Sequence, residues 1–210
     1  MSRFFDLKAA LAFLLALLIT SGYAGADPQR RLTEYEYDAR GRLSEERLRL
    51  ASDTPGSYRS RTVYTYDALS NRISATSYPR TDGTEGTFAD PPLVTRYFFS
   101  NSQFPTLLTK EVDPDGYAVV YTYNSSGQPV EVIGPFLDAT PTVHTDDPSC
   151  NSAGVACAKY GYSAVAGVSM ISEVRTKIGP TACRRQTLNY HGAAKRFAVQ
   201  SATSQPSCTF

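Results

Sequence analysis

The side chains with the greatest capacity for chemistry are the thiols, of which the sequence has four: Cys150, Cys157, Cys183 and Cys208. If the chain is exported, an even number of cysteines indicates disulfides, and four cysteines permit three pairings. The spacing favours Cys150 with Cys157 around a short loop, and Cys183 with Cys208 near the C-terminus. Zinc is the alternative, but there is no C-x-x-C pair and neither histidine stands at ligand spacing from two cysteines. We expect disulfides, no metal and no other cofactor.

Catalytic motifs are missing from the sequence. It contains no Gly-x-Ser-x-Gly, no His-Glu-x-x-His and only two histidines, His144 and His191. The adjacent Glu45 and Glu46 would point to opposite faces of a strand, which prevents a shared acid–base site there. The sequence therefore predicts a protein that is not an enzyme, and an exported hydrolase is the least favoured interpretation.

The charge balance excludes two classes of partner. Among 210 residues, 21 are Lys or Arg and 20 are Asp or Glu, while 41% are hydrophobic. A chain so close to neutrality has no basic footprint for nucleic acid and none for an anionic membrane surface. The hydrophobic share is sufficient for a folded protein.

The N-terminus has the pattern of a secretory signal peptide over residues 1–26. A basic start is followed by an apolar run, Ala9 to Ile19, and by an Ala-x-Ala sequence that ends at Ala26. Eleven helical residues reach only about 16 Å, too short to cross a membrane as an anchor. We expect a mature chain from Asp27, without stable membrane insertion, in the periplasm, in the medium or on the cell surface.

Tyrosine doublets recur along the rest of the chain. Three copies are clear: 35–43 (YEYDARGRL), 64–72 (YTYDALSNR) and 121–130 (YTYNSSGQPV), with weaker ones near Tyr97, Tyr160 and Tyr190. Tyrosines at i and i+2 share one face of a strand. The doublets are the candidate ligand-binding residues, by stacking on sugar faces, although such pairs more often pack within a sheet: Tyr35, Tyr37, Tyr64, Tyr66, Tyr121 and Tyr123.

Turn residues follow each doublet. Asx, two permissive residues and Gly form the pattern of a type I turn, in which Gly accepts a positive φ. A second turn of this type, Asp113 to Gly116, lies between copies and lacks the distal Glu of a calcium loop. In the 64–72 copy Ser70 replaces Gly, which should strain the turn or move the left-handed position to Asn71. The predicted turn residues are Asp38, Gly41, Asp67, Asp113, Gly116, Asn124 and Gly127.

Two turns per period imply two strands per period, so the sequence predicts an all-β fold, a long antiparallel meander of hairpins. Leu43 to Leu50 has helical propensity, but its place as the return arm of a hairpin favours a strand. Residues 81–92 and a cysteine-containing segment, 134–158, are rich in loop-forming residues. We treat residues 27–210 as one repeat array.

The unit Tyr-x-Tyr-Asp-x-x-Gly-Arg-Leu, with Asp-Pro-x-Gly between copies, resembles the repeat of the YD-repeat (RHS-repeat) family. The resemblance covers most of residues 32–200 and implies a strand–turn–strand ribbon coiled into a hollow β shell. In bacterial toxin systems such shells enclose a C-terminal effector, and members are also described as carbohydrate-binding. This chain is shorter than a full shell and lacks the Arg-Tyr-Tyr-Asp-Pro segment that ends shells in toxin-bearing members. Six imperfect repeats would give about twelve strands, a curved but incomplete shell without a toxin domain.

These observations favour an exported, non-catalytic scaffold or binding protein. An unclosed array exposes edge strands that a protein partner can extend. A carbohydrate-binding module that uses the paired tyrosine faces is the alternative.

Overall fold

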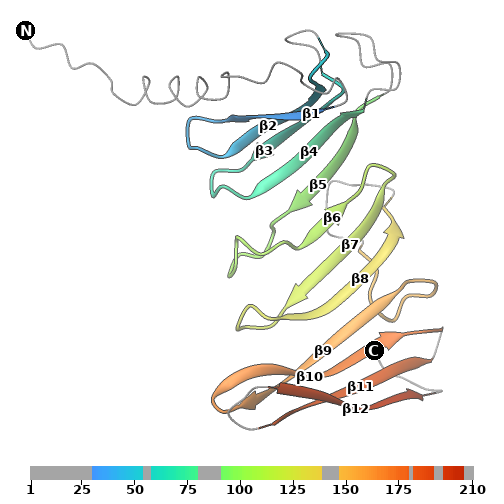
Figure 1. Ribbon diagram of the computed structural model, residues 1–210. Helices are drawn as coiled ribbons and strands as arrows, with labels where there is room; N and C mark the ends of the chain where they lie inside the picture. Colours follow the sequence, from blue (N-terminus) through green and yellow to red (C-terminus); the bar gives the residue numbers. More distant parts are fainter. Residues whose placement is uncertain are drawn as a thin grey trace, which may run out of the picture.

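The computed structural model describes residues 30–53, 58–79, 91–138, 147–179, 182–191 and 196–205, with side chains described as far as Tyr190. These residues form twelve strands in a single antiparallel sheet, and the strands follow chain order from β1 to β12 (Figure 1). The prediction of an all-β meander with two strands per repeat is confirmed. The described residues include no helix long and apolar enough to cross a membrane.

Each strand pairs with the strands before and after it in the sequence. The strands are β1 (Arg31–Tyr37), β2 (Leu43–Leu50), β3 (Ser60–Tyr66), β4 (Arg72–Pro79), β5 (Leu93–Phe98), β6 (Lys110–Val112), β7 (Tyr117–Tyr123), β8 (Pro129–Leu137), β9 (Cys157–Val165), β10 (Val168–Lys177), β11 (Cys183–His191) and β12 (Arg196–Gln205). The segment Leu43–Leu50 is a strand, as its position in a hairpin predicted.

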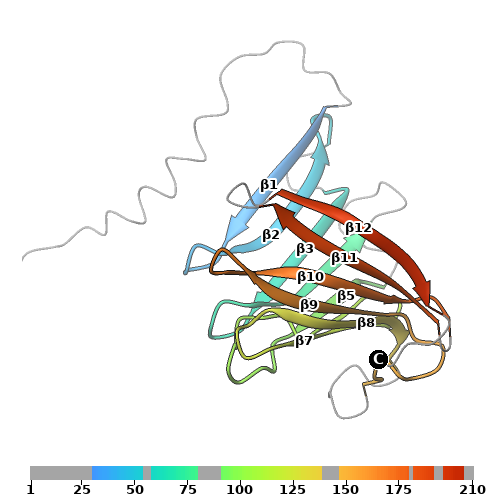
Figure 2. The same ribbon diagram turned by 90° about the horizontal axis from the view of Figure 1, so that it is seen from below.

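The sheet is a curved ribbon with two ends. In Figure 1, β1 lies at the top of the coil and β12 at the bottom, while the view from below in Figure 2 shows the strands turning about a common axis. The strand order ends at β1 and β12, so the sheet is open. The right-handed twist that strands prefer accumulates over many strands into such a coil.

The predicted turns have the expected conformations. Gly41, Gly116 and Gly127 have φ values of +76°, +86° and +76°. The Asx side chain that begins each turn accepts hydrogen bonds from backbone amides: Asp38 Oδ1 accepts from the amides of Arg40 and Arg42 at 2.9 and 3.0 Å. Asp113 and Asn124 accept equivalent pairs of bonds.

Ser70 itself adopts the left-handed conformation, with φ of 71°. Of the two outcomes expected for this turn, the strained one is therefore correct. The Ser70 hydroxyl accepts a hydrogen bond from Arg42 Nη1 at 3.2 Å, and the Asp67 carboxylate accepts from the Asn71 amide at 2.8 Å. These bonds hold a residue with a Cβ in a conformation that glycine adopts at no steric cost.

The loop predicted from residue 134 begins later, because β8 continues to Leu137. Gly134 makes this extension feasible: it has φ of +123° and its Cα lies against the backbone of Ala118 and Val119 on β7, where a Cβ would clash. The sequence places Gly134 in a predicted loop, whereas in the structure it allows β8 to lie close to β7.

Among the described residues, buried apolar side chains are few, and most lie at the middle of the ribbon, on β6 to β9 and in the loop before β9; Cys183 on β11 is the exception. One cluster consists of Val120, Ile133, Cys150 and Cys157, with Phe136 and Val155 against it. Most other strand residues are half-buried, as expected when one sheet layer has solvent close to both faces. The disulfide loop, residues 147–156, covers one face over this cluster. We call that side of the sheet the loop face and the other the tyrosine face.

Candidate functional site

A tyrosine in each of four repeats bonds to the backbone of the strand or segment that precedes its own strand. Tyr66 on β3 donates its hydroxyl to the carbonyl oxygen of Leu43, the first residue of β2, at 2.7 Å. The same bond recurs from Tyr123 to Leu108, from Tyr162 to Pro129 and from Tyr190 to Ile171, at 2.6, 2.6 and 2.7 Å. These tyrosines are therefore structural clamps between successive hairpins, a role that the doublet spacing alone did not reveal.

The remaining candidate tyrosines occupy different environments. Tyr64 donates to Glu46 Oε2 at 3.3 Å, and burial raises its pKa. Burial also raises the pKa of Tyr121, as do the nearby Glu111 and Tyr160. Tyr35 and Tyr37 on the end strand β1 are 53% and 63% exposed. The structure thus places the six tyrosines on successive strands and does not gather them into one site.

Arginines connect one turn to the next. Arg42 binds the Asp38 carboxylate, donates to the Asp67 carbonyl at 3.2 Å and stacks over the Tyr66 ring at 4.5 Å. Arg72 lies between the rings of Tyr64 and Tyr97, at 5.4 and 5.0 Å. The Arg of the repeat therefore stabilises adjacent repeats through ion pairing, hydrogen bonding and cation–π contact.

A second repeated unit lies on the loop face. Glu45 on β2 accepts hydrogen bonds from Arg47, two residues further along, and from Arg61 on β3, which lies directly opposite Arg47. Arg61 is bidentate, with Nε 2.7 Å from Oε1 and Nη2 3.0 Å from Oε2. Burial acts to raise the Glu45 pKa, but the bonds from Arg61 and Arg47 outweigh it, and the pKa is lowered.

The same unit recurs in the last repeats. Glu173 on β10 accepts from Arg175 and from Arg185 on β11, which lies opposite Arg175, and its pKa is likewise lowered. Sequence reasoning missed both units. The signal was available as Ser-Glu-x-Arg, which occurs at 44–47 and at 172–175.

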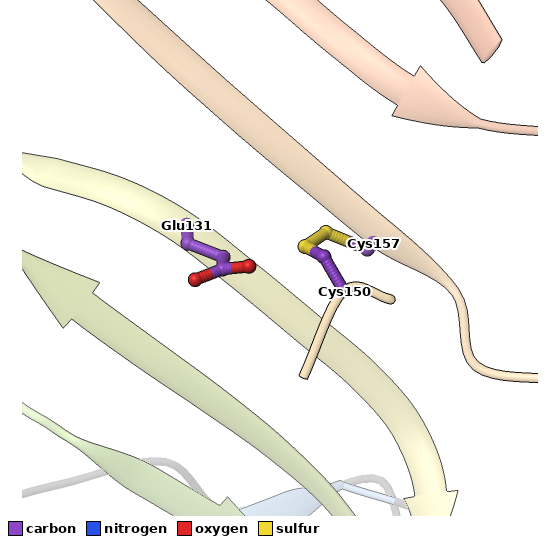
Figure 3. Close-up of side chains that lie close together, drawn as sticks. All are labelled: Glu131, Cys150 and Cys157. Atoms are coloured by element: carbon purple, nitrogen blue, oxygen red, sulfur yellow. A yellow bond between two sulfur atoms is a disulfide. The ribbon is translucent and has the colours of Figure 1, made fainter. Parts of the chain in front are cut away.

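Glu131 on β8 departs from this arrangement. The residue two positions along is Ile133, and the residue opposite Ile133 is Cys157 on β9, so neither arginine is present. The ion pair described for Glu131 is with Lys159, whose Nζ is 3.7 Å from Oε1, beyond hydrogen-bond distance. Figure 3 shows the Glu131 carboxylate beside the sulfurs of Cys150 and Cys157.

A hollow of about 500 Å³ opens next to Glu131 on the loop face. Its lining comes from the turn after β5, from β7 and β8 and from the start of the disulfide loop: Ser100, Asn101, Thr109, Val120, Tyr121, Thr122, Tyr123, Glu131, Ile133, Asp147 and Pro148. Thr122 pairs with Glu131 and Val120 with Ile133, so these side chains share the loop face. Strand alternation then puts the Tyr121 ring on the tyrosine face, and the ring does not point into the hollow.

A buried lysine anchors the wall of the hollow. Lys110 is 1% exposed, and its Nζ lies 2.8 Å from Asp138 Oδ2 and 2.6 Å from Asp147 Oδ1. Burial acts to lower the Lys110 pKa, but the bonds to the two carboxylates outweigh it, so the pKa is raised. The two carboxylates come from opposite ends of the segment between β8 and the disulfide, and Lys110 therefore fixes both ends against β6.

Cys150 and Cys157 form a disulfide, as predicted, with a Cα–Cα separation of 5.3 Å. Their sulfurs and a Glu131 oxygen lie within 4.8 Å of one another, but sulfurs joined to each other lack the thiolates that bind a metal ion. Cys183 is also disulfide-bonded. Its expected partner Cys208 lies outside the described residues, as do His144, the predicted signal peptide and the side chain of His191.

No protein-family model matches the chain, and no curated protein matches its sequence. The resemblance to YD-repeat proteins therefore rests on the repeat residues and stays a prediction.

Solved structures with a similar fold include two Tc toxin assemblies. A TcdB2–TccC3–Cdc42 structure is 12% identical, with a TM-score of 0.42, covering 81% of this chain and 9% of that one. A mutant Tc holotoxin pore from Photorhabdus luminescens is 13% identical, with a TM-score of 0.24 and coverage of 82% and 11%. A Bacteroides fragilis protein of unknown function is 8% identical, with a TM-score of 0.27 and coverage of 85% and 94%. At these values the likenesses assign neither a family nor a function.

Proposed function

We propose that the protein is an exported, non-catalytic scaffold that binds an extended protein segment along the outer edge of β1. The observation that carries this proposal is the single open sheet, in which β1 is an end strand. An end strand presents backbone donors and acceptors that another strand can pair with. The disulfides support export, because they persist in oxidising compartments.

The hydrogen-bonding register defines the groups available on β1. The Arg30 carbonyl accepts from the Ala51 amide at 2.8 Å, so residue 30 belongs to a hydrogen-bonded pair. Because such pairs alternate along antiparallel strands, the even-numbered residues of β1 bond to β2. The amides and carbonyls of Arg31, Thr33 and Tyr35 therefore point away from the sheet.

Tyr37 adds a side-chain group to this edge. It occupies the position at which Tyr66, Tyr123 and Tyr162 donate to the backbone of the preceding strand or segment. In the described part of the chain β1 has no preceding strand, and the Tyr37 side chain is exposed. A strand added to β1 would supply the carbonyl that the other repeats provide internally.

The experiment places a photo-crosslinking amino acid at position 35 in producing cells, with position 117, a tyrosine of similar exposure on β7, as the matched control. We expect an adduct from position 35 that disappears with Thr33→Pro, which removes an outward amide and keeps the β1–β2 bonds. Thr33→Val should retain the adduct. An adduct that is indifferent to Thr33→Pro, or none above the control, would refute the proposal.

Saccharide binding on β1 is the second candidate function, and the exposure of Tyr35 and Tyr37 favours it over stacking on the clamped tyrosines. A glycan-binding screen of the chain and of Tyr35→Ala and Tyr37→Ala tests it. Loss of a sugar signal at unchanged thermal stability supports a site on β1. A signal that survives both substitutions excludes one.

A further inference from the structure

We infer that the hollow beside Glu131 is a binding site for a guanidinium group, either an arginine side chain of a protein partner or a small guanidinium compound. The inference is independent of strand pairing at β1. It rests on a comparison of three equivalent positions within the sheet, Glu45, Glu131 and Glu173.

Two of these carboxylates are saturated by the chain itself. In each case one arginine stands two residues further along the same strand and a second stands directly opposite the first on the next strand. Charge-assisted guanidinium–carboxylate bonds of this kind are strong and directional. The fold thus places a glutamate in the same way twice, and in both places two arginines satisfy its carboxylate.

At Glu131 the positions of both arginines have changed to apolar or disulfide-bonded residues, Ile133 and Cys157. Its carboxylate keeps a Lys159 contact of 3.7 Å, whereas Arg61 approaches Glu45 to 2.7 Å. The side chain is 21% exposed, so water reaches it only in part. The Glu131 carboxylate therefore occupies a position that binds guanidinium groups elsewhere in the sheet, but the described sheet provides no arginine for it.

The space next to Glu131 is suited to a guanidinium group. The hollow, at about 500 Å³, is within the size range of small-ligand sites. A guanidinium has five donors and no acceptor, and the lining offers the hydroxyl oxygen of Thr122 besides the Glu131 carboxylate. Ile133 and Pro148 provide apolar surface for an alkyl stem. Asp147, already bound to Lys110, adds negative charge that disfavours anionic ligands.

The experiment is an NMR titration of the oxidised chain with three probes: methylguanidinium, an acetyl-Gly-Arg-Gly-amide peptide and its lysine counterpart. We expect saturable shifts of the Thr122 and Glu131 amides with both guanidinium probes and affinity at least about tenfold weaker in Glu131→Gln, the loss of roughly one charge-assisted bond. Glu111→Gln, on the tyrosine face, should bind as the unmodified chain does. Tighter binding of the arginine peptide identifies a protein arginine as the occupant, and equal binding identifies a small compound.

Three results would overturn the inference: no saturable shift with millimolar methylguanidinium or arginine peptide, equal affinity for the lysine peptide, or unchanged affinity in Glu131→Gln. Thr33→Pro serves as a further control, because it blocks the β1 edge and should leave this binding intact. A negative NMR titration would therefore not affect the proposed scaffold function. A negative crosslinking result at β1 would likewise not affect the guanidinium site.

Discussion

The hydroxyl of Tyr66 lies 2.7 Å from the carbonyl oxygen of Leu43, and Tyr123 makes the equivalent bond to Leu108 at 2.6 Å. The bond joins the last residue of one tyrosine-bearing strand to the strand or segment before it. It therefore acts between hairpins, in addition to the backbone pairing of the neighbouring strands.

Removing one of these hydroxyls should weaken the sheet without disturbing its packing. We expect Tyr66→Phe and Tyr123→Phe each to lower the free energy of unfolding by about 1 kcal/mol, the usual net contribution of one hydrogen bond. Urea unfolding followed by circular dichroism measures the change. Tyr35→Phe, at an exposed position on β1, is the control and should stay within about 0.5 kcal/mol of the unmodified chain. Equal effects at all three positions would contradict the clamp.

The turn residues provide a matched pair of substitutions. Gly41→Ala should lower the free energy of unfolding by about 1 kcal/mol, because φ at this position is +76°. No neighbouring atom lies within 4 Å of the added Cβ, so the backbone conformation alone decides the effect. Ser70→Gly should raise the free energy of unfolding by about 0.5 kcal/mol, since relief of the left-handed serine exceeds the loss of an exposed hydrogen bond from Arg42. Thermal unfolding of both variants tests this. A destabilised Ser70→Gly would show that the Arg42 bond dominates.

Lys110→Met should lower the free energy of unfolding severely, by about 3 kcal/mol or more, because it removes the buried ammonium group that pairs with Asp138 and Asp147. Urea unfolding at pH 7, followed by circular dichroism, measures the loss. Lys159→Met is the control, since its long contact with a partly exposed partner contributes little.

Acid should weaken the two glutamate–arginine units. The pKa values of Glu45 and Glu173 are lowered from 4.5, so their contribution is complete above that pH and is lost as the pH falls through the depressed folded-state values. Urea midpoints between pH 7 and pH 3 should fall less steeply in Glu45→Gln than in the unmodified chain. Glu111→Gln, outside both units, is the control. If the urea midpoint of Glu45→Gln fell with pH as steeply as that of the unmodified chain, the Glu45 ion pairs would not be a source of the acid sensitivity.

The sequence predicted the local features of the fold and missed the features that depend on register. Asx–Gly turns and tyrosine doublets are encoded within a few residues, so the turns at Asp38 and Asn124 could be placed in advance. The burial of Lys110 could not, because its partners Asp138 and Asp147 lie 28 and 37 residues away and meet it only in the folded sheet. The contact of Glu45 with Arg61 likewise requires the β2–β3 pairing.

Pairing in strict chain order has a consequence for how the molecule is made. A strand that bonds only to its sequence neighbours can join the growing sheet without waiting for distant segments. If assembly followed the order of the chain, the Cys150–Cys157 bond would close after the eight strands that precede it had paired.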